Sequence, residues 1–512
     1  MNDIEIAQAV SSVLSRFTKM TPESAIINSA AETAPPPAPE RPPAPASASL
    51  NAIVARALAQ KRVTTIPSPA CEPGNGAFAS MDEAIAAAVL AQVQYRHCLM
   101  QERATFVQGI RDVFLQEPVL QTISRMAVEE TGMGNYADKL TKNRVAAQKT
   151  PGPEDLITGA LSGDSGLTLT EFSAYGVIGS ITPTTNPTET IINNSIGMLA
   201  AGNSVVFSPH PRSRKVSLYC VELINHKLAS LGAPANLVVT VTQPSIDNTS
   251  TLISDPRINM LVATGGPAIV KTVMSSGKKA IGAGAGNPPV VVDETADIEK
   301  AARDIICGCS FDNNLPCVAE KEVIVVNQVA DYLIHCMKKS GGYLLCDKAL
   351  LRQMESLVLN EKGTGPDTAF VGKDARYILQ QLGIIAPEDT KVILVETAKN
   401  HPFVVHELMM PVLPVVRVDN VDEAIELAVQ VEHGNRHTAI MHSTNVEKLT
   451  KMARQIQTTI FVKNGPSYAG LGVGGEGHAT FTIAGPTGEG LTSARSFARA
   501  RRCVMVEALN VR

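Results

Sequence analysis

One cysteine stands where a nucleophile could work. Cys317 lies in residues 310–319, SFDNNLPCVA, where two asparagines and a proline predict a turn. An apolar helical run, 298–309, precedes this turn, and an apolar strand run, 322–326, follows it. A cysteine on such a turn can be a nucleophile, although most free cysteines are small buried hydrophobes. This segment alone leaves both interpretations of Cys317 open.

Two glycine-rich segments could contact a nucleotide. Residues 282–286, GAGAG, look like a dinucleotide motif, but prolines and a strand-like VVV follow where that motif needs a helix. A glycine-rich active-site loop is favoured there, with an ordinary turn as the alternative. Thr264, Gly265 and Gly266 precede Pro267 between a strand and a helix, where backbone N–H groups attract phosphate or ribose oxygens. A simple helix start would explain the proline equally well.

No metal site is predicted. His433 and His437 are spaced like metal ligands on a helix, but Gly434 and Asn435 interrupt it, and no glutamate stands where a metalloprotease needs its base. A loop near a substrate is the favoured interpretation. The nine cysteines are scattered without a CxxC pair, which indicates reduced thiols and not a disulfide framework or a zinc site.

Composition limits the class of protein. The 512 residues suffice for two or three domains, and 44% hydrophobic with 18% charged residues indicates a globular chain. A net charge of -4 argues against nucleic acid or an anionic membrane as the main partner. No apolar run is long enough for a membrane span, and the start lacks the features of a secretory signal. We therefore expect a protein that stays inside the cell.

The periodicity predicts an α/β fold. Helices are expected at 81–96, 101–119 and 119–130, and then strands at 175–181, 204–207, 237–241 and 260–263 alternate with helices at 188–201, 215–230, 245–254 and 267–276. A second block has strands at 323–326, 392–396, 412–418, 438–442 and 460–463. Short apolar strands between helices predict parallel, doubly wound sheets, which commonly bind nucleotides at the carboxyl ends of their strands. A cleft between two such domains is a common active site.

The head of the chain differs from the rest. Residues 3–19 carry apolar side chains at helical spacing, and 34–49 form a proline and alanine tract that predicts a semi-rigid linker. A helix this short is only marginally stable alone in water, and its apolar stripe therefore needs a partner surface. It could dock on another protein or pack on its own chain; the long linker favours docking.

Taken together, the motifs resemble the aldehyde dehydrogenase superfamily, and more closely its CoA-acylating branch. The matching segments occur in family order over residues 55–512: ITPTTNPTETII from 181, VVFSPHP from 205, VATGGP from 262, GAGAGNPP from 282, FDNNLPCVAEKEVIV from 311, HELMMPVLPVVRV from 406, EHGNRHTA from 432 and KNGPS from 463. The resemblance implies an aldehyde dehydrogenase-like α/β fold. Its expected parts are a helix at 1–19, a linker at 20–50, a Rossmann-like cofactor domain at 51–288 with an arm around 157–174, a catalytic domain at 289–479 and an oligomerisation segment at 480–512.

The resemblance also implies roles for residues. Cys317 is expected to be the nucleophile, and the Asn186 side-chain amide with the Cys317 backbone N–H to form the oxyanion hole. The residues expected to bind the cofactor are Thr182, Pro183, Thr184, Ser208, Pro209, His210, Thr264, Gly265, Gly266, Ile281, Gly282, Ala283, Glu407 and Pro411. Glu407 matches the residue that holds the nicotinamide ribose. Ser208 and Pro211 depart from the hydrolytic members, which leaves the choice between NAD and NADP open; NAD is favoured.

One departure predicts the product. Hydrolytic members carry a glutamate that activates water, and that position falls on Gly282. Without this base the attack of water loses roughly two to four powers of ten, so coenzyme A, a more acidic thiol, is expected to take the acyl group. Propionaldehyde is the favoured substrate and acetaldehyde the next, since one methylene changes binding by only about 1–3 kcal/mol. The rivals are a hydrolytic or phosphorylating dehydrogenase and a non-enzymatic, shell-binding scaffold.

The resemblance extends to location and assembly. The N-terminal helix and linker look like the encapsulation peptide of enzymes inside bacterial microcompartments. This implies a place in the microcompartment lumen within the bacterial cytoplasm, with residues 1–19 binding a shell protein. A homodimer or homotetramer is expected, with 167–171 and 480–512 as the exchanging arms.

Overall fold

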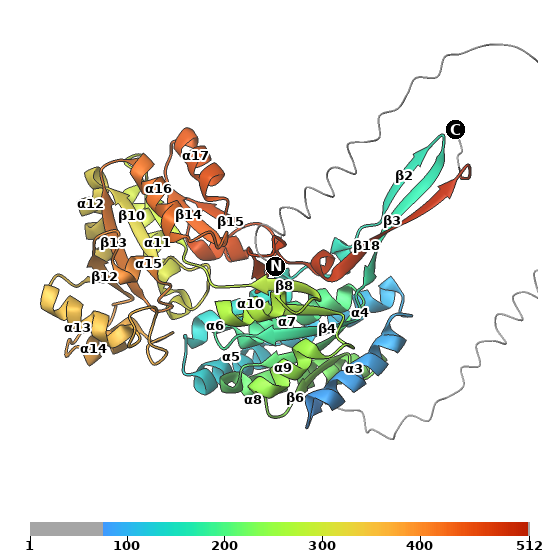
Figure 1. The fold of residues 1–512 in the computed structure, drawn as a ribbon. Helices are drawn as coiled ribbons and strands as arrows, with labels where there is room; N and C mark the ends of the chain where they lie inside the picture. The colour runs from blue at the N-terminus through green and yellow to red at the C-terminus, as the bar shows by residue number, and fades with distance from the viewer. Residues whose placement is uncertain (1–74, 510–512) are drawn as a thin grey trace, which may run out of the picture. The chain divides into compact units, whose positions relative to one another are not determined.

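The computed structural model describes residues 75–509, so the predicted helix at 1–19 and linker at 20–50 lie outside the described part. Three larger β-sheets organise this part (Figure 1). The described residues belong to one compact unit, Cys71–Arg512. The domain boundaries expected at 288/289 and 479/480 stay predictions.

The first sheet has six parallel strands in the order β1-β6-β5-β4-β7-β8. Its strands are β1 Ala77–Phe78, β4 Val177–Thr182, β5 Ser204–Pro209, β6 Val238–Val241, β7 Met260–Thr264 and β8 Lys279–Ala283. Every residue of β4 and β5 is buried, because helices cover both faces of the sheet. The doubly wound parallel sheet predicted for this segment is confirmed.

Two groups of helices pack on this sheet. One apolar cluster joins it to α3 Met81–Tyr95, α9 Ile246–Ser254 and α10 Pro267–Met274. A second apolar cluster joins the opposite face of the sheet to a group of helices. These are α4 Met100–Phe114, α5 Glu117–Thr131, α6 Tyr136–Lys149, α7 Pro187–Ala200 and α8 Arg214–Ser230. The alternation of strand side chains between these clusters explains why the strands are apolar throughout.

The structure corrects one helix prediction and adds one helix that was not predicted. The helix expected at 101–119 ends at Phe114, and α5 begins at Glu117 with Pro118 in its first turn. Proline has no backbone N–H and suits a helix start, so the apolar run breaks there and restarts. Helix α6 was not predicted, because its buried face includes Lys139, Lys142 and Asn143, which look like surface residues in the sequence.

The second sheet has seven parallel strands in the order β11-β12-β13-β10-β9-β14-β15. Its strands are β9 Pro289–Val292, β10 Glu322–Val326, β11 Gly342–Leu344, β12 Val392–Glu396, β13 Val412–Val418, β14 Thr438–His442 and β15 Ile460–Lys463. Its helices are α11 Ile298–Ser310, α12 Asn327–Lys339, α13 Lys348–Val358, α14 Ala375–Gln381, α15 Pro402–Val405, α16 Val421–Val431 and α17 Val446–Ile456. The five strands predicted for this block are confirmed.

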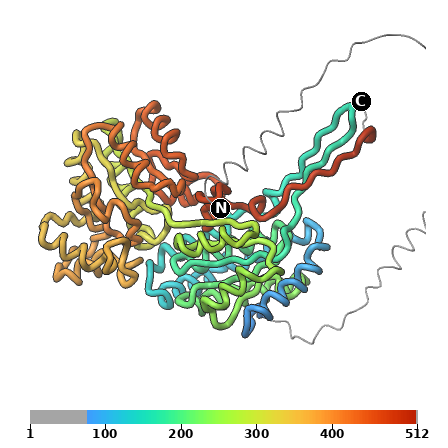
Figure 2. The backbone as a smooth tube through the Cα atoms, in the orientation of Figure 1, coloured from blue at the N-terminus to red at the C-terminus, as the bar shows by residue number. Residues whose placement is uncertain are grey.

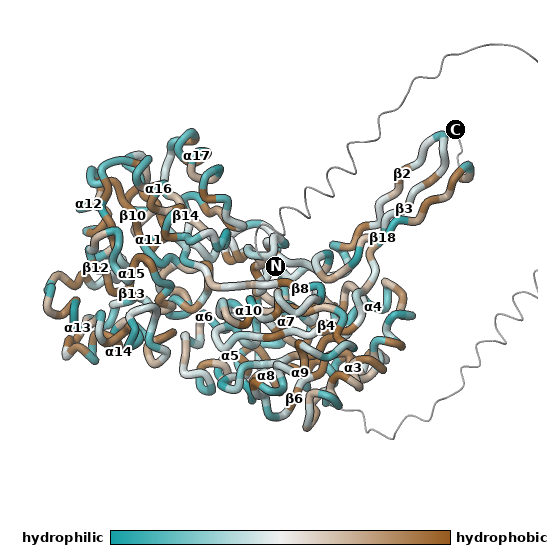
Figure 3. Tube along the Cα trace, viewed as in Figure 1, coloured by the Kyte–Doolittle hydropathy of each residue, from teal (hydrophilic) through white to brown (hydrophobic). Residues whose placement is uncertain are grey.

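The third sheet is antiparallel and small. It joins β2 Gly159–Gly163, β3 Gly166–Ala174 and β18 Ala498–Val506 in the order β18-β3-β2. The C-terminal part of the chain therefore returns to pair with β3 (Figure 2). Part of β18 is hydrophobic (Figure 3), and Val504 and Val506 are exposed. None of the helices within residues 75–509 is long and apolar enough to cross a membrane.

Candidate active site

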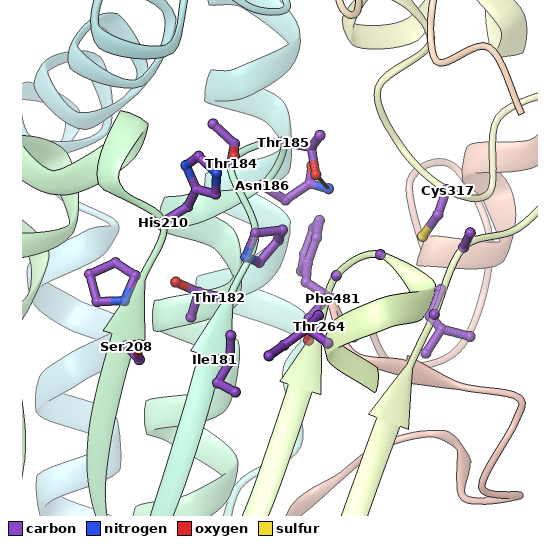
Figure 4. A pocket seen from close by; sticks show the side chains of 18 of the residues that line it. Ile181, Thr182, Thr184, Thr185, Asn186, Ser208, His210, Thr264, Cys317 and Phe481 are labelled. Atoms are coloured by element: carbon purple, nitrogen blue, oxygen red, sulfur yellow. Dashed lines mark hydrogen bonds between the residues drawn. The ribbon is translucent and has the colours of Figure 1, made fainter. Parts of the chain in front are cut away.

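A pocket of about 680 Å³ lies at the carboxyl ends of β4, β5 and β7. β4 and β7 are neighbours in the sheet, but the chain leaves β4 toward β5 and leaves β7 toward β8. Their following loops diverge, and the crevice at such a switch point is a common nucleotide site. The opposite wall contains the turn that carries Cys317 (Figure 4). The pocket therefore combines a nucleotide-type crevice with the candidate nucleophile.

Most of the predicted site residues line this pocket. They are Cys317, Asn186, Thr182, Pro183, Thr184, Ser208, Pro209, His210, Thr264, Gly265, Gly266 and Glu407. Figure 4 shows Asn186 and Cys317 facing each other across it. These residues are far apart in the sequence: Asn186 follows β4 of the first sheet, whereas Cys317 and Glu407 lie in the segments that precede β10 and β13 of the second sheet.

Four predicted cofactor residues do not line the pocket. Ile281, Gly282 and Ala283 belong to β8, where they pair with β7, so the glycine-rich loop begins only at Gly284. A Cβ atom on Gly282 would lie 2.7 Å from Cγ1 of Val270, on α10. Position 282 therefore faces a helix and not the pocket. Pro411 lies directly before β13, and its carbonyl accepts a hydrogen bond from the Ile393 N–H (2.8 Å).

The turn before Cys317 is built by polar residues. Asp312, Asn313 and Asn314 have φ values of 49°, 53° and 65°, a conformation that aspartate and asparagine tolerate better than most residues. The Asn314 side-chain amide donates to the carbonyls of Cys309 (3.0 Å) and Glu320 (2.9 Å). One asparagine thus ties together the two ends of the nucleophile segment, and the predicted turn is confirmed.

The Cys317 thiol titrates far above neutral pH. Burial raises the pKa of Cys317 to about 12, the negative charge of Glu407 adds to the rise, and Lys321 opposes it. Burial also raises the pKa of Glu407, against the opposing effect of Lys321, whose Nζ lies 3.8 Å from Glu407 Oε1. At neutral pH only a small fraction of Cys317 is thiolate in this state of the pocket.

This raised pKa predicts a steep pH dependence of alkylation. The rate constant for the reaction of Cys317 with iodoacetamide should rise about tenfold per pH unit from pH 7 to 9, because only the thiolate reacts and its fraction keeps growing below pH 12. Mass spectrometry of the Cys317 peptide would measure it, with the exposed Cys346 as the reference in the same sample. A rate that levels off by pH 8 would contradict the prediction.

Asn186 ends the loop after β4 and caps α7. Its carbonyl accepts from the N–H (3.1 Å) and hydroxyl (2.6 Å) of Thr190, so the backbone is anchored. Its side chain lines the pocket and is buried. The amide Nδ2 donates to Thr185 Oγ1 at 3.2 Å, and Oδ1 accepts from Lys142. One N–H of this amide is left to serve a ligand in the pocket.

The pocket suits a nicotinamide dinucleotide. Thr182 Oγ1 and Glu407 Oε1 are buried without a hydrogen-bond partner, although both residues line the pocket. A Cβ atom on Gly266 would meet no atom within 4 Å, so there is open space over this glycine at the start of α10. Unpaired polar atoms and accessible backbone at a helix start match the ribose and phosphate groups of such a cofactor.

His433 and His437 lie in different surroundings, and neither lines the pocket. His433 Nε2 lies 2.8 Å from the Val405 carbonyl, and His437 is buried with Nδ1 2.9 Å from Thr438 Oγ1. A Cβ atom on Gly286 would meet both the Cys317 carbonyl oxygen and the His437 ring. His437 therefore lies beside the nucleophile segment. Within residues 75–509 no group of three or more possible metal ligands gathers.

Several pocket residues were missed from the sequence. Helix α9 supplies Ile246, Thr249 and Ser250, and Thr249 Oγ1 lies 2.9 Å from Ser208 Oγ. The position of α9 directly after strand β6 was a usable signal, by the same rule that selected the loops after β4 and β7. Phe481 and Met409 also line the pocket, and they come from segments without a recognisable local motif.

Comparison with known proteins defines the class. The family model described as "Aldehyde dehydrogenase family" matches residues 68–482. This chain belongs to the aldehyde dehydrogenase family, and the fold predicted from the sequence is confirmed.

The more particular likeness is to acylating members. The chain is 49% identical over 464 residues to the propanal dehydrogenase (CoA-propanoylating) of Salmonella typhimurium, covering 90% of this chain and 99% of that protein. A propionaldehyde dehydrogenase from Rhodopseudomonas palustris, solved with bound CoA and an acylated cysteine, has 69% identity and a TM-score of 0.85, covering 86% of this chain and 100% of that one. The propionaldehyde dehydrogenase of the Clostridium phytofermentans fucose utilisation microcompartment has 51% identity and a TM-score of 0.83, covering 85% and 100%.

Proposed function

We propose that this protein is a CoA-acylating aldehyde dehydrogenase that converts a short-chain aldehyde, NAD and CoA to acyl-CoA and NADH through a thioester on Cys317. The observation that carries the proposal is the pocket in which Cys317 faces Asn186 across a nucleotide-type crevice. The relatives named above support the acylating assignment.

The first half of the proposed reaction forms the thioester. The Cys317 thiol releases its proton to water and its sulfur bonds to the aldehyde carbon, so the carbonyl oxygen takes on negative charge. The amide N–H of Asn186 and the backbone N–H of Cys317 would stabilise that oxygen. The carbon–oxygen double bond then re-forms as the hydrogen leaves the carbon with its electron pair, and a thioester remains on Cys317.

When bound, NAD would supply the acceptor for this hydride, which the two-electron oxidation of the aldehyde carbon requires. Thr182, Ser208, Gly265 and Gly266 would hold its phosphate and ribose groups, and Glu407 would hold the nicotinamide ribose. The β5 side of the pocket offers hydroxyls from Ser208 and Thr249 but no carboxylate among its described lining residues. NAD is favoured, and this lack of a repelling charge leaves room for NADP.

The second half transfers the acyl group. The CoA thiol loses its proton as its sulfur bonds to the thioester carbon, and the Cys317 sulfur leaves as a thiolate that takes up a proton, which yields acyl-CoA and restores the Cys317 thiol. Among the described residues that line the pocket, Glu407 is the one carboxylate, and it is assigned to the cofactor. Water therefore lacks a dedicated base, whereas a thiol needs less help to ionise.

The test is product analysis. Purified protein with propionaldehyde, NAD and CoA should form NADH and propionyl-CoA in about equal amounts, because each hydride transfer is followed by one acyl transfer. Chromatography with mass spectrometry would identify the acyl product. Propionate formed in place of propionyl-CoA would exclude the acylating activity, and a requirement for inorganic phosphate would indicate a phosphorylating enzyme.

Propionaldehyde is proposed as the favoured substrate and acetaldehyde as the next. Two of the relatives above are named for propionaldehyde and one for propanal, the same compound. The comparison of kcat/KM for the two aldehydes decides the preference. A difference of only about 1–3 kcal/mol in transition-state binding is expected for one methylene group.

Substitution of Asn186 is expected to have a large effect on turnover. Asn186→Ala should lower kcat about 100-fold to 1,000-fold with little change in KM for NAD, because one oxyanion donor is lost. The near-isosteric Asn186→Asp should lose about as much, since it keeps the shape and lacks the N–H group. Steady-state NADH formation measures both variants. Retention of more than about a tenth of kcat in either variant would contradict the oxyanion role.

We also propose an assembly and a location. The three-stranded sheet exposes Leu161 (72%), Val504 (55%) and Val506 (69%), which suits burial against a second copy in a homodimer or homotetramer. The Clostridium phytofermentans relative comes from a microcompartment, which supports a place in a microcompartment lumen. Binding of residues 1–19 to a shell protein remains part of this proposal.

A further inference from the structure

A buried cluster of four charged side chains lies beside the pocket. Lys139 and Lys142 come from α6, Glu189 from α7, and Asp312 from the turn before Cys317. Lys142 Nζ lies 3.0 Å from Glu189 Oε1 and 2.5 Å from Asp312 Oδ2, and Lys139 Nζ lies 3.0 Å from Asp312 Oδ2. Each side chain is at most 1% exposed. Two positive and two negative charges balance, which buried charges require.

Lys142 also contacts the candidate oxyanion residue. Its Nζ donates to Asn186 Oδ1 at 2.5 Å. An ammonium group has three donors and no acceptor, so it can face only the oxygen end of the amide. If the amide turned over, its NH₂ group would point at the ammonium, donor against donor. Lys142 therefore sets which end of the Asn186 amide is left to the pocket.

The charge on Lys142 is secured by its partners. Burial alone would lower the pKa of Lys142, but Asp312 and Glu189 raise it above the ordinary value. Lys142 is thus charged throughout the working pH range. A permanent donor at this position keeps the oxygen of Asn186 engaged and its N–H groups directed away from the cluster.

We propose that Lys142 is a positioning residue that fixes the Asn186 amide with its N–H directed to the aldehyde oxygen, an inference that rests on the proposed function. Asp312 extends this role, because the carboxylate that pairs with Lys142 belongs to the turn that leads to Cys317. The Asp312 N–H donates to Asp138 (2.7 Å), which adds a second link between α6 and that turn. The cluster thus contacts both the oxyanion donor and the turn before Cys317, and Lys139 and Asp138 still anchor that turn when Lys142 is removed.

Lys139 provides a matched control. It lies one helical turn before Lys142, is equally buried and shares the same two carboxylates. Its remaining contact goes to the Thr185 backbone carbonyl and not to the Asn186 side chain. Removing either lysine takes one amine from the same buried cluster, and only the removal of Lys142 frees the Asn186 amide.

The test compares single and combined variants. Lys142→Met should lower kcat about 10-fold to 100-fold with KM values for NAD and aldehyde within about threefold, whereas Lys139→Met should lower kcat less than about threefold. Because Lys142 acts through Asn186, adding Lys142→Met to Asn186→Ala should cause no further loss. A loss that multiplies with that of Asn186→Ala, or equal losses for the two lysine variants, would overturn the proposal.

A second pair of variants tests the proposal if the single lysine variants fold poorly. Lys142→Met/Glu189→Gln and Lys139→Met/Glu189→Gln each keep one lysine and Asp312, so the cluster stays neutral. The same difference in kcat is expected between the two members of this pair, and equal kcat values would again overturn the proposal. Failure of the proposed function is distinct, because the unmodified protein would then form no acyl-CoA.

Discussion

Replacing Cys317 with alanine is expected to lower aldehyde-dependent NADH formation by about four powers of ten or more. The sulfur forms the bond that carries the acyl group through the whole reaction, and removal of a nucleophile costs enzymes losses of this size. Cys317→Ser should be nearly as poor, because a hydroxyl is a much weaker nucleophile than a thiol. Steady-state kinetics measure the loss, and mass spectrometry of the intact protein with aldehyde and NAD should show no acyl adduct.

The matched control for this prediction is Cys346→Ala, which removes an exposed thiol. It should retain kcat and still form the adduct on the peptide that contains Cys317. NAD binding by the Cys317→Ala protein should also persist, because the crevice at the ends of β4, β5 and β7 is unchanged. An acyl adduct on another residue of the Cys317→Ala protein would refute the assignment of the nucleophile.

The features that were predicted well depend on local chemistry. The strands at 322–326 and 412–418 are rich in valine, and their structural bounds match those found in the sequence closely. The turn at 310–319 follows from its asparagines and proline, which act over a few residues. Such signals need no knowledge of the rest of the fold.

Helix α6 shows why other features escaped prediction. Lys139 and Lys142 are almost always surface residues by type, so a sequence with lysines at 139 and 142 indicates a solvated face. Their burial depends on Glu189 and Asp312, which lie about fifty and about 170 positions further along the chain. No local pattern encodes a charge pair of that separation.

The direction in which a side chain at position 282 would point also could not be predicted from the sequence. The alignment of motifs places the missing glutamate at Gly282, but whether a side chain there reaches the pocket depends on the register of β8 against β7. Ala263 pairs with Gly282 in that register, and the Cβ direction at 282 leads to α10. Since a strand alternates its faces, a shift of one residue would have reversed the result.

Omitting CoA is the second large expected effect. With propionaldehyde and NAD alone, the protein should release about one NADH per active site and then slow by roughly two to four powers of ten, since the thioester accumulates and water lacks a base. Stopped-flow absorbance resolves the burst and the slow phase, and added CoA should restore turnover at once. A steady rate without CoA within about tenfold of the rate with CoA would contradict the acylating mechanism.

The substitution Gly282→Glu tests whether the lack of a glutamate at position 282 explains the dependence on CoA. If a missing side chain at 282 were the sole difference from a hydrolytic enzyme, this variant should turn over without CoA. A Cβ atom there would lie 2.7 Å from Val270 Cγ1 and 3.3 Å from Met274 Sδ, so the carboxylate starts against the apolar side of α10. We expect a loss of stability of about 1–3 kcal/mol or more in urea unfolding and no faster CoA-independent phase. A clear gain in that phase would show that the β8 register gives way, and that the carboxylate reaches the thioester on Cys317.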